Sequence, residues 1–261
     1  MINTRKLLLG SAGFIFVWIE CLLFYLIHFE RADFGFNLHY TTIVAAALFS
    51  WLVLIIEIAT AKENGEDPKK ILLSKSQGNF IRIAMLFTLL ADYFLVAASE
   101  INNPAGVATF IGTQVFICLH IICNEKNKKW QTANLIVRAV LSVVIVIVAL
   151  IVLGEDADSL AIVSVIYYAN LITNAIFAHR IGKGGIMLTI GLVLFALCDI
   201  NVGLSGLDML YGGFSEGSLF YNIMNSDVDL IWLFYIPSQT LIPLTLLLAK
   251  NKNSQYKKEQ I

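Results

Sequence analysis

Two aspartates are the residues best placed to do chemistry, because each stands alone inside a long apolar run. Asp92 lies within residues 80–98, and Asp199 lies within residues 186–206. A charged side chain at the centre of a bilayer costs about 2.5–3.5 kcal/mol even on lenient insertion scales, so an intramembrane acid indicates function by default. Two carboxyl groups in one site support general acid–base catalysis, in which one group donates a proton and the other accepts one.

The two aspartates also lie at matched depth. Asp92 is twelve residues past the start of its run, and Asp199 is thirteen past the start of its own. At a rise of 1.5 Å per residue, both lie about 18–20 Å from the same membrane boundary if the two runs cross in the same direction. This match predicts one shared interior site with both aspartates as catalytic residues.

Polar side chains on other apolar runs are candidate ligands for a substrate. Tyr167, Asn170 and Asn174 recur at i, i+3 and i+7 and therefore share one helix face. Tyr235 and Gln239 share a face in the last run. The candidate substrate-binding residues on these grounds are Gln114, Asn170, Asn174, Tyr235 and Gln239. The same side chains could instead hydrogen-bond helix to helix, at about 0.6 kcal/mol per bond on average.

Two further acids lie within apolar runs. Glu20 is in the middle of the first run and could join the interior site. Glu57 is near the end of the second run, where its side chain could reach toward Lys62 at the membrane surface.

The composition predicts the scaffold that positions these residues. Of the 261 residues, 58% are hydrophobic and only 14% charged, whereas soluble domains carry about 25% charged residues. Eight stretches are long enough to cross a bilayer, at about 20 apolar residues each. They are residues 7–29, 40–61, 80–98, 105–123, 135–153, 159–178, 186–206 and 230–249. We predict an all-α polytopic transmembrane bundle that forms a single domain over residues 1–261.

Basic residues predict the orientation, because Lys and Arg are concentrated in cytoplasmic loops. All but Arg31 of the 18 basic residues fall in alternate loops or next to them, on one side of the predicted membrane. An even number of spans then places both termini in the cytoplasm. The compact chain without long tails favours a bacterial inner membrane.

Several classes of site find no support in the sequence. No His-x-x-x-His pattern and no Ser-His-Asp arrangement is visible, so we expect no metal and no cofactor. The four cysteines all lie within or at the ends of apolar runs, where they serve as small apolar side chains. We expect a membrane lipid or lysolipid as the partner and no nucleic acid.

Short motifs from the third apolar run onward resemble the YhhN-type membrane proteins, the lysoplasmalogenase family. Each motif is short, and the motifs support the resemblance because they occur in the same order and at the same spacing as in the family. The matching residues are Asp92; Gly106 and Phe110; Tyr168; Gly191, Leu194, Phe195 and Asp199; and Tyr235, Gln239 and Ile242. The sequence departs from the family pattern at three positions: Ala91 replaces a glycine, Gln114 a histidine and Cys198 a serine. The resemblance adds Tyr168 to the expected substrate-binding residues.

The resemblance implies hydrolysis of the vinyl ether bond of a lysoplasmalogen, which releases a fatty aldehyde and a glycerophospho-base. Two carboxyl groups suit this reaction, since one protonates the vinyl ether and the other assists the attacking water.

Two alternatives to this enzyme remain. Asp92 and Asp199 could bind a proton or substrate in a membrane carrier, or could be structural in a lipid-binding or assembly protein. A cavity that reaches both acids and opens to lipid favours the enzyme. A passage gated from both faces favours the carrier, and a filled interior around hydrogen-bonded acids favours the structural role.

Overall fold

The computed structural model describes residues 4–30, 37–65, 67, 76–97, 103–182, 184–211 and 213–248, which form helices and short connections without a strand. The first half contains α1 (Thr4–Tyr25) with its π-helical extension η1 (Leu26–Glu30), α2 (Leu38–Glu63), α4 (Ser76–Asp92) with the π-helical η2 (Tyr93–Ala97), and α5 (Asn103–Asn124). The second half contains α6 (Lys128–Leu153), η3 (Gly154–Asp156), α7 (Ser159–Ala178), η4 (His179–Ile181), α8 (Gly185–Tyr211), α9 (Leu219–Met224) and α10 (Leu230–Leu248).

The predicted all-α class is confirmed, and in the described part of the chain eight helices are long and apolar enough to span a membrane, as predicted. Seven of the eight spans begin and end within three residues of the predicted boundaries. The fifth was placed wrongly at its start, since its helix begins at Lys128 and not at residue 135. Asn127 caps this helix, with its side-chain oxygen accepting from the Lys129 N–H at 2.9 Å, and the cap starts the helix before the apolar run begins.

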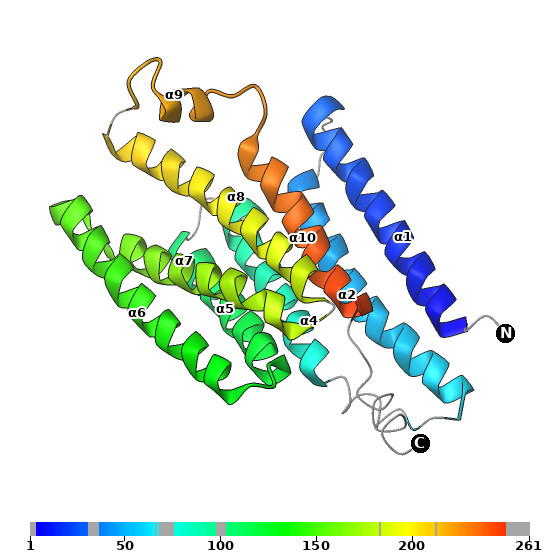
Figure 1. Cartoon of the computed structure of the whole chain (residues 1–261). Coiled ribbons are helices and arrows are strands. Elements are labelled where there is room, and N and C mark those ends of the chain that lie inside the picture. Colours follow the sequence, from blue (N-terminus) through cyan, green and yellow to red (C-terminus); the bar gives the residue numbers. More distant parts are fainter. Residues whose placement is uncertain are drawn as a thin grey trace.

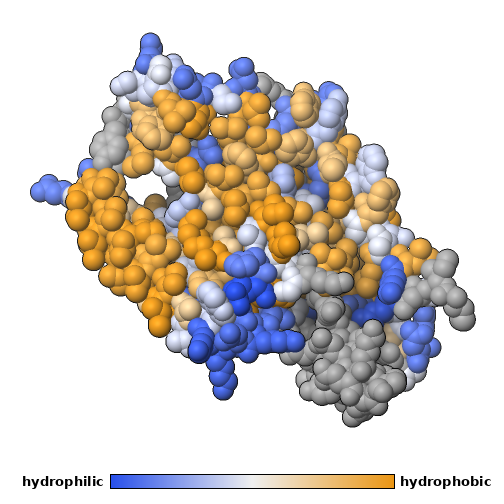
Figure 2. All heavy atoms as spheres, viewed as in Figure 1, coloured by the Kyte–Doolittle hydropathy of each residue, from blue (hydrophilic) through white to orange (hydrophobic). Residues whose placement is uncertain are grey.

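α1 and α6 lie at the edges of the bundle, and the other long helices form its body (Figure 1). α8 packs along α10, α4 along α5, and α7 contacts both α5 and α8. α1 packs on α2 and α10, while α6 packs chiefly on α7. The edge position of α6 explains why only 6% of its most apolar window is buried, which leaves its Val and Ile side chains to face lipid. Orange, hydrophobic side chains cover much of the visible surface in Figure 2.

The two ends of the bundle differ in charge. One end, called the basic end here, holds the start of α1 and the end of α10 together with Arg5, Lys126 and Arg180. The opposite, acidic end holds the short α9 together with Asp158 and Asp229. Asp158 caps α7 at this end by accepting from the Ala161 N–H at 2.7 Å.

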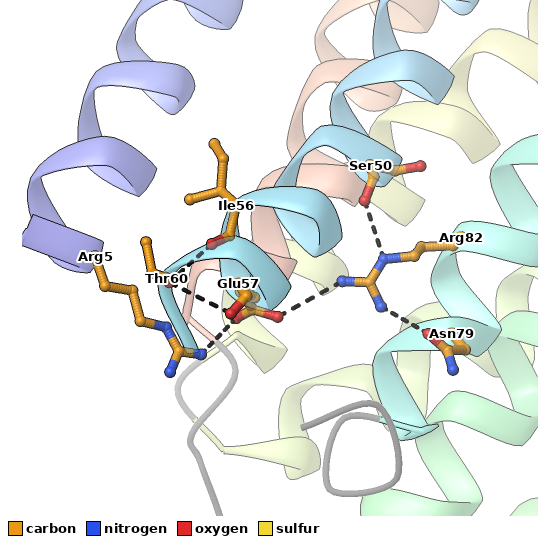
Figure 3. A network of polar contacts seen from close by, with 7 residues as sticks. All are labelled: Arg5, Ser50, Ile56, Glu57, Thr60, Asn79 and Arg82. Carbon is orange, nitrogen blue, oxygen red and sulfur yellow. Dashed lines mark hydrogen bonds and ion pairs between the residues drawn. The ribbon is translucent and has the colours of Figure 1, made fainter. Parts of the chain in front are cut away.

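A buried ion-pair network fastens three helices near the basic end (Figure 3). Glu57 of α2 lies 3.2 Å from the Arg5 guanidinium of α1 and 3.9 Å from that of Arg82 of α4. Arg82 also donates to the Ser50 carbonyl oxygen at 3.0 Å, and its side chain is almost wholly buried. Glu57 thus bridges cations from two other helices. The sequence had suggested Lys62 as its partner, but no ion pair between Glu57 and Lys62 is found among the described residues.

Candidate functional site

Asp92 forms a short hydrogen bond across the bundle. The Tyr235 hydroxyl of α10 donates to Oδ2 of Asp92 at 2.5 Å, and both side chains are buried, with Asp92 only 3% exposed. Asp92 is the last residue of α4, and the chain continues directly into the π-helical segment η2. Such π-helical irregularities occur frequently at functional sites. The bond brings together two of the predicted site residues.

Asp199 forms a second pair of the same kind. The Tyr167 hydroxyl of α7 donates to Oδ2 of Asp199 at 2.6 Å. Tyr167 is buried, whereas Asp199 is only half-buried. In both pairs, no hydrogen bond to Oδ1 of the aspartate is found within the described residues. A phenol therefore orients each carboxyl group through one oxygen, while the other oxygen accepts no hydrogen bond from the described residues.

Phe195 of α8 lies between the two acid–phenol pairs. Its ring centroid is 5.3 Å from that of Tyr235 and 6.4 Å from that of Tyr167. Phe110 of α5 packs on Tyr167 and on Phe195, at 5.6 Å from each. These aromatic contacts join the pairs into one buried centre built from α4, α5, α7, α8 and α10.

The visible surface has an opening between helices. Figure 2 shows a hole through the molecule, and the same view in Figure 1 places it between the acidic-end part of α8 and the paired helices α6 and α7. Residues 160–166 of α7 are all only half-buried, whereas Tyr167 begins the buried part of this helix. The bond between Tyr167 and Asp199 joins α7 to α8, and Asp199 is half-buried, whereas Asp92 is only 3% exposed.

Gln239 presents a buried amide one helical turn from Tyr235. Its side chain is 1% exposed, and neither its Oε1 nor its Nε2 has a hydrogen-bond partner in the described part of the chain. Ser238 beside it has a buried hydroxyl in the same condition. Buried polar groups are nearly always hydrogen-bonded in folded proteins. The amide can therefore hold a substrate oxygen or a water next to the Asp92 pair.

The predicted amide residues form a separate cluster around Arg138 of α6, which we call the guanidinium cluster (Gln114, Asn134, Arg138, Asn170 and Asn174). Arg138 donates to the side-chain oxygens of Asn170 at 2.5 Å, Asn174 at 2.7 Å and Asn134 at 3.2 Å. Asn174 in turn donates to Oε1 and to the carbonyl oxygen of Gln114, both at 2.9 Å. The cluster lies about one to two helical turns from Tyr167 along α7, toward the basic end.

Two candidate residues lie outside these groups. Tyr168 is half-buried and packs against the hydrophobic core, while its neighbour Tyr167 contacts Asp199. Glu20 of α1 is buried, and neither of its carboxyl oxygens has a hydrogen-bond partner among the described residues. Glu20 therefore forms no bond with either acid–phenol pair.

Sequence reasoning missed Arg138 and the role of Tyr167. Arg138 was counted as a residue of the cytoplasmic side, although it lies ten residues into its helix. The sequence does contain a sign that Arg138 belongs to the interior, because Arg138 falls inside the predicted apolar span and follows Asn134 by one helical turn. Tyr167 had been recognised on the polar face of its helix but not as the partner of Asp199.

Comparison with known proteins agrees with the motifs. A profile of the YhhN family matches residues 39–246, which covers seven of the eight spans and both acid–phenol pairs. No curated protein and no solved structure matches the chain. The chain belongs to the YhhN family, the family that includes the lysoplasmalogenases.

Proposed function

We propose that this protein is an integral membrane hydrolase that cleaves the vinyl ether bond of a lysoplasmalogen-like lysolipid, with Asp92 and Asp199 as its catalytic residues. The observation that carries the proposal is the pair of acid–phenol hydrogen bonds joined through Phe195 within one buried centre. Membership of the YhhN family supports it.

Two carboxyl groups are sufficient for the proposed reaction. A neutral carboxylic acid protonates the β-carbon of the vinyl ether, which gives an oxocarbenium ion stabilised by the second, ionised carboxylate. That carboxylate then takes a proton from water as the water oxygen bonds to the α-carbon. The resulting hemiacetal breaks its bond to the glycerol oxygen, which leaves with a proton, and releases the fatty aldehyde. One water is consumed for each ether cleaved.

The phenols and the amide have supporting roles in this proposal. Tyr235 and Tyr167 hold Oδ2 of the two aspartates and so direct Oδ1 toward the substrate. Gln239 binds the ether oxygen or the attacking water through its buried amide. Pre-organised hydrogen-bonding groups of this kind act most strongly where water is excluded. Tyr168 remains a candidate substrate contact on the resemblance alone.

The opening between α8 and the α6–α7 pair is the proposed route for the acyl chain. Asp199 of α8 is half-buried and bonds to Tyr167 of α7, so it lies at the junction of the two helices that border this opening. We place the basic end in the cytoplasm and the protein in a bacterial inner membrane, because Lys and Arg favour the cytoplasmic side.

The test is release of fatty aldehyde from lysoplasmalogen by the purified protein in detergent. We expect turnover by the wild type and its loss in Asp92→Asn and in Asp199→Asn. Glu20→Gln is the matched control, since Glu20 is also a buried intramembrane acid but belongs to neither pair. It should retain turnover.

Two outcomes would overturn the proposal. No aldehyde from a folded wild type would favour the carrier. Full turnover in both aspartate variants would give the acids a structural role, which would also be consistent with the burial of Asp92.

A further inference from the structure

Arg138 is a cation inside a membrane span without an acidic partner. No described carboxylate forms an ion pair with Arg138, whereas Arg5, Arg82 and Arg180 each face a glutamate. Its four hydrogen bonds within the described residues all go to neutral oxygens of Asn134, Asn170 and Asn174. A half-buried guanidinium surrounded by neutral amides keeps its full positive charge, and that charge favours an anion beside it.

The guanidinium cluster also has more donors than acceptors. Three buried N–H groups have no partner among the described residues: Nε of Arg138, Nδ2 of Asn134 and Nε2 of Gln114. Rotating an amide exchanges its oxygen and nitrogen but changes neither total, so the surplus does not depend on how the amides are oriented. A ligand that supplies several acceptor oxygens and a negative charge would satisfy all three groups.

The cluster lies where the head of a membrane lipid can reach it. Arg138 lies fifteen residues, or about 22 Å, from the end of α6 at Leu153, so a hydrocarbon core about 30 Å thick that ends there extends about 8 Å beyond Arg138. It lies at the seam between α7 and the edge helix α6, beside the exposed Val137. A phosphate drawn slightly inward from the headgroup layer would meet it.

The spacing between the cluster and the acid–phenol pairs matches a lysolipid. Tyr167 and Asn174 are seven residues apart on α7, or about 10 Å along the helix. Seven covalent bonds separate phosphorus from the β-carbon of the vinyl ether, which spans roughly 8 Å when extended. We propose that Arg138, with the side-chain amides of Asn134 and Gln114, binds the phosphate of the lysolipid and so places its ether at the aspartates. The identity of this ligand rests on the proposed hydrolase function, whereas the anion site does not.

The experiment compares two ether lipids that the protein cannot cleave. The probes are 1-O-hexadecyl-glycero-3-phosphocholine and 1-O-hexadecylglycerol, which differ only in the phosphocholine group. Their affinities for the full chain are measured in detergent micelles at equal mole fractions by tryptophan fluorescence. Charge-assisted hydrogen bonds to phosphate predict a preference of the wild type for the phospholipid of roughly tenfold to a hundredfold.

Two variants test the residues. Arg138→Gln should lose the preference. Asn134→Asp should also lose it, because a carboxylate 3.2 Å from the guanidinium supplies the missing negative charge inside the protein with almost no change in size. This second variant retains the fold even if Arg138→Gln unfolds. The control is Arg180→Gln, which removes a cation already paired with Glu125 at 2.7 Å and should keep the preference.

The other possible results would overturn either the anion site, its assignment to a lipid headgroup, or the hydrolase function. A preference retained in Asn134→Asp would overturn the anion site, and so would a wild type that shows neither the preference nor stabilisation by inorganic phosphate. Stabilisation by inorganic phosphate alone, without a preference between the two ethers, would overturn the assignment to a lipid headgroup. A wild type that shows the preference but releases no aldehyde from lysoplasmalogen would keep the anion site and refute the hydrolase.

Discussion

The two acid–phenol pairs predict different costs for removing their hydroxyl groups. Tyr235→Phe leaves Oδ2 of Asp92 without its donor at a site where both side chains are buried, so water cannot replace the bond. We expect a loss of about 1.5–2 kcal/mol in the free energy of unfolding, near the upper end for bonds within membranes. Tyr167→Phe should cost about 0.5–1 kcal/mol, near the average for such bonds within membranes, because Asp199 is only half-buried and the protein encloses its carboxyl group less completely.

Reversible unfolding in mixed micelles with increasing SDS, followed by circular dichroism, measures these losses. Both substitutions keep the ring, so the packing on Phe195 is retained. Tyr25→Phe is the control, because its hydroxyl donates to Glu30 at 2.7 Å at an exposed position and its loss should leave stability unchanged. A cost for Tyr167→Phe that equals or exceeds that for Tyr235→Phe would refute this reasoning, as would equality of both with the control.

Three further changes have defined outcomes in the same unfolding assay. Glu20→Leu should raise the free energy of unfolding by about 1–3 kcal/mol, because it removes a buried carboxyl group without a hydrogen-bond partner among the described residues; a loss would show that Glu20 is bonded. Gly185→Ala should destabilise by about 1–3 kcal/mol, since its Cβ would lie 2.6 Å from the Ala178 carbonyl oxygen, whereas Gly203→Ala in the same helix meets nothing within 4 Å and should not destabilise. Burial opposes ionisation of Glu125, but hydrogen bonds from the Asn127 N–H and the Arg180 guanidinium outweigh the effect of burial and lower the pKa of Glu125 below 4.5. The ionised Glu125 therefore contributes stability above pH 4.5, and this contribution is lost as the pH falls below that value. Arg180→Gln should weaken this acid-side loss, and an unchanged pH profile would contradict the assignment.

The spans were predictable because each is a long apolar run, and apolar length is what a bilayer requires. The fifth span shows where that reasoning stops. Its first turns carry Gln131, Asn134 and Arg138, which resemble a loop in composition. They are helical because Asn127 caps the helix and because α7 supplies amide oxygens for Arg138. Partners on another helix cannot be read from the composition of one segment.

The candidate site was predictable in its acids but not in their partners. Asp92 and Asp199 stand out because a carboxyl group within an apolar run is costly. The choice between Tyr167 and Tyr168 depends on rotation about the helix, where adjacent side chains point about 100° apart. The polar face shared with Asn170 and Asn174 favoured Tyr167, whereas the motif favoured Tyr168. Only the packing of α7 on α8 shows that Tyr167 contacts Asp199.

Glu57 illustrates the same limit. Lys62 is five residues away on the same helix, and five residues correspond to about 140° of rotation, so the two side chains point to different sides. The actual partners, Arg5 and Arg82, come from helices whose position beside α2 depends on the assembled bundle.

The most direct test of the central claim is cleavage of lysoplasmalogen in D2O, with the aldehyde trapped as it forms and analysed by mass spectrometry. Protonation of the vinyl ether at its β-carbon predicts one deuterium on the carbon next to the aldehyde group, with product absent in Asp92→Asn and in Asp199→Asn. Aldehyde without this deuterium would contradict carbon protonation by a carboxyl group. Labelled aldehyde formed at the wild-type rate by both variants would show that the two aspartates are not its source.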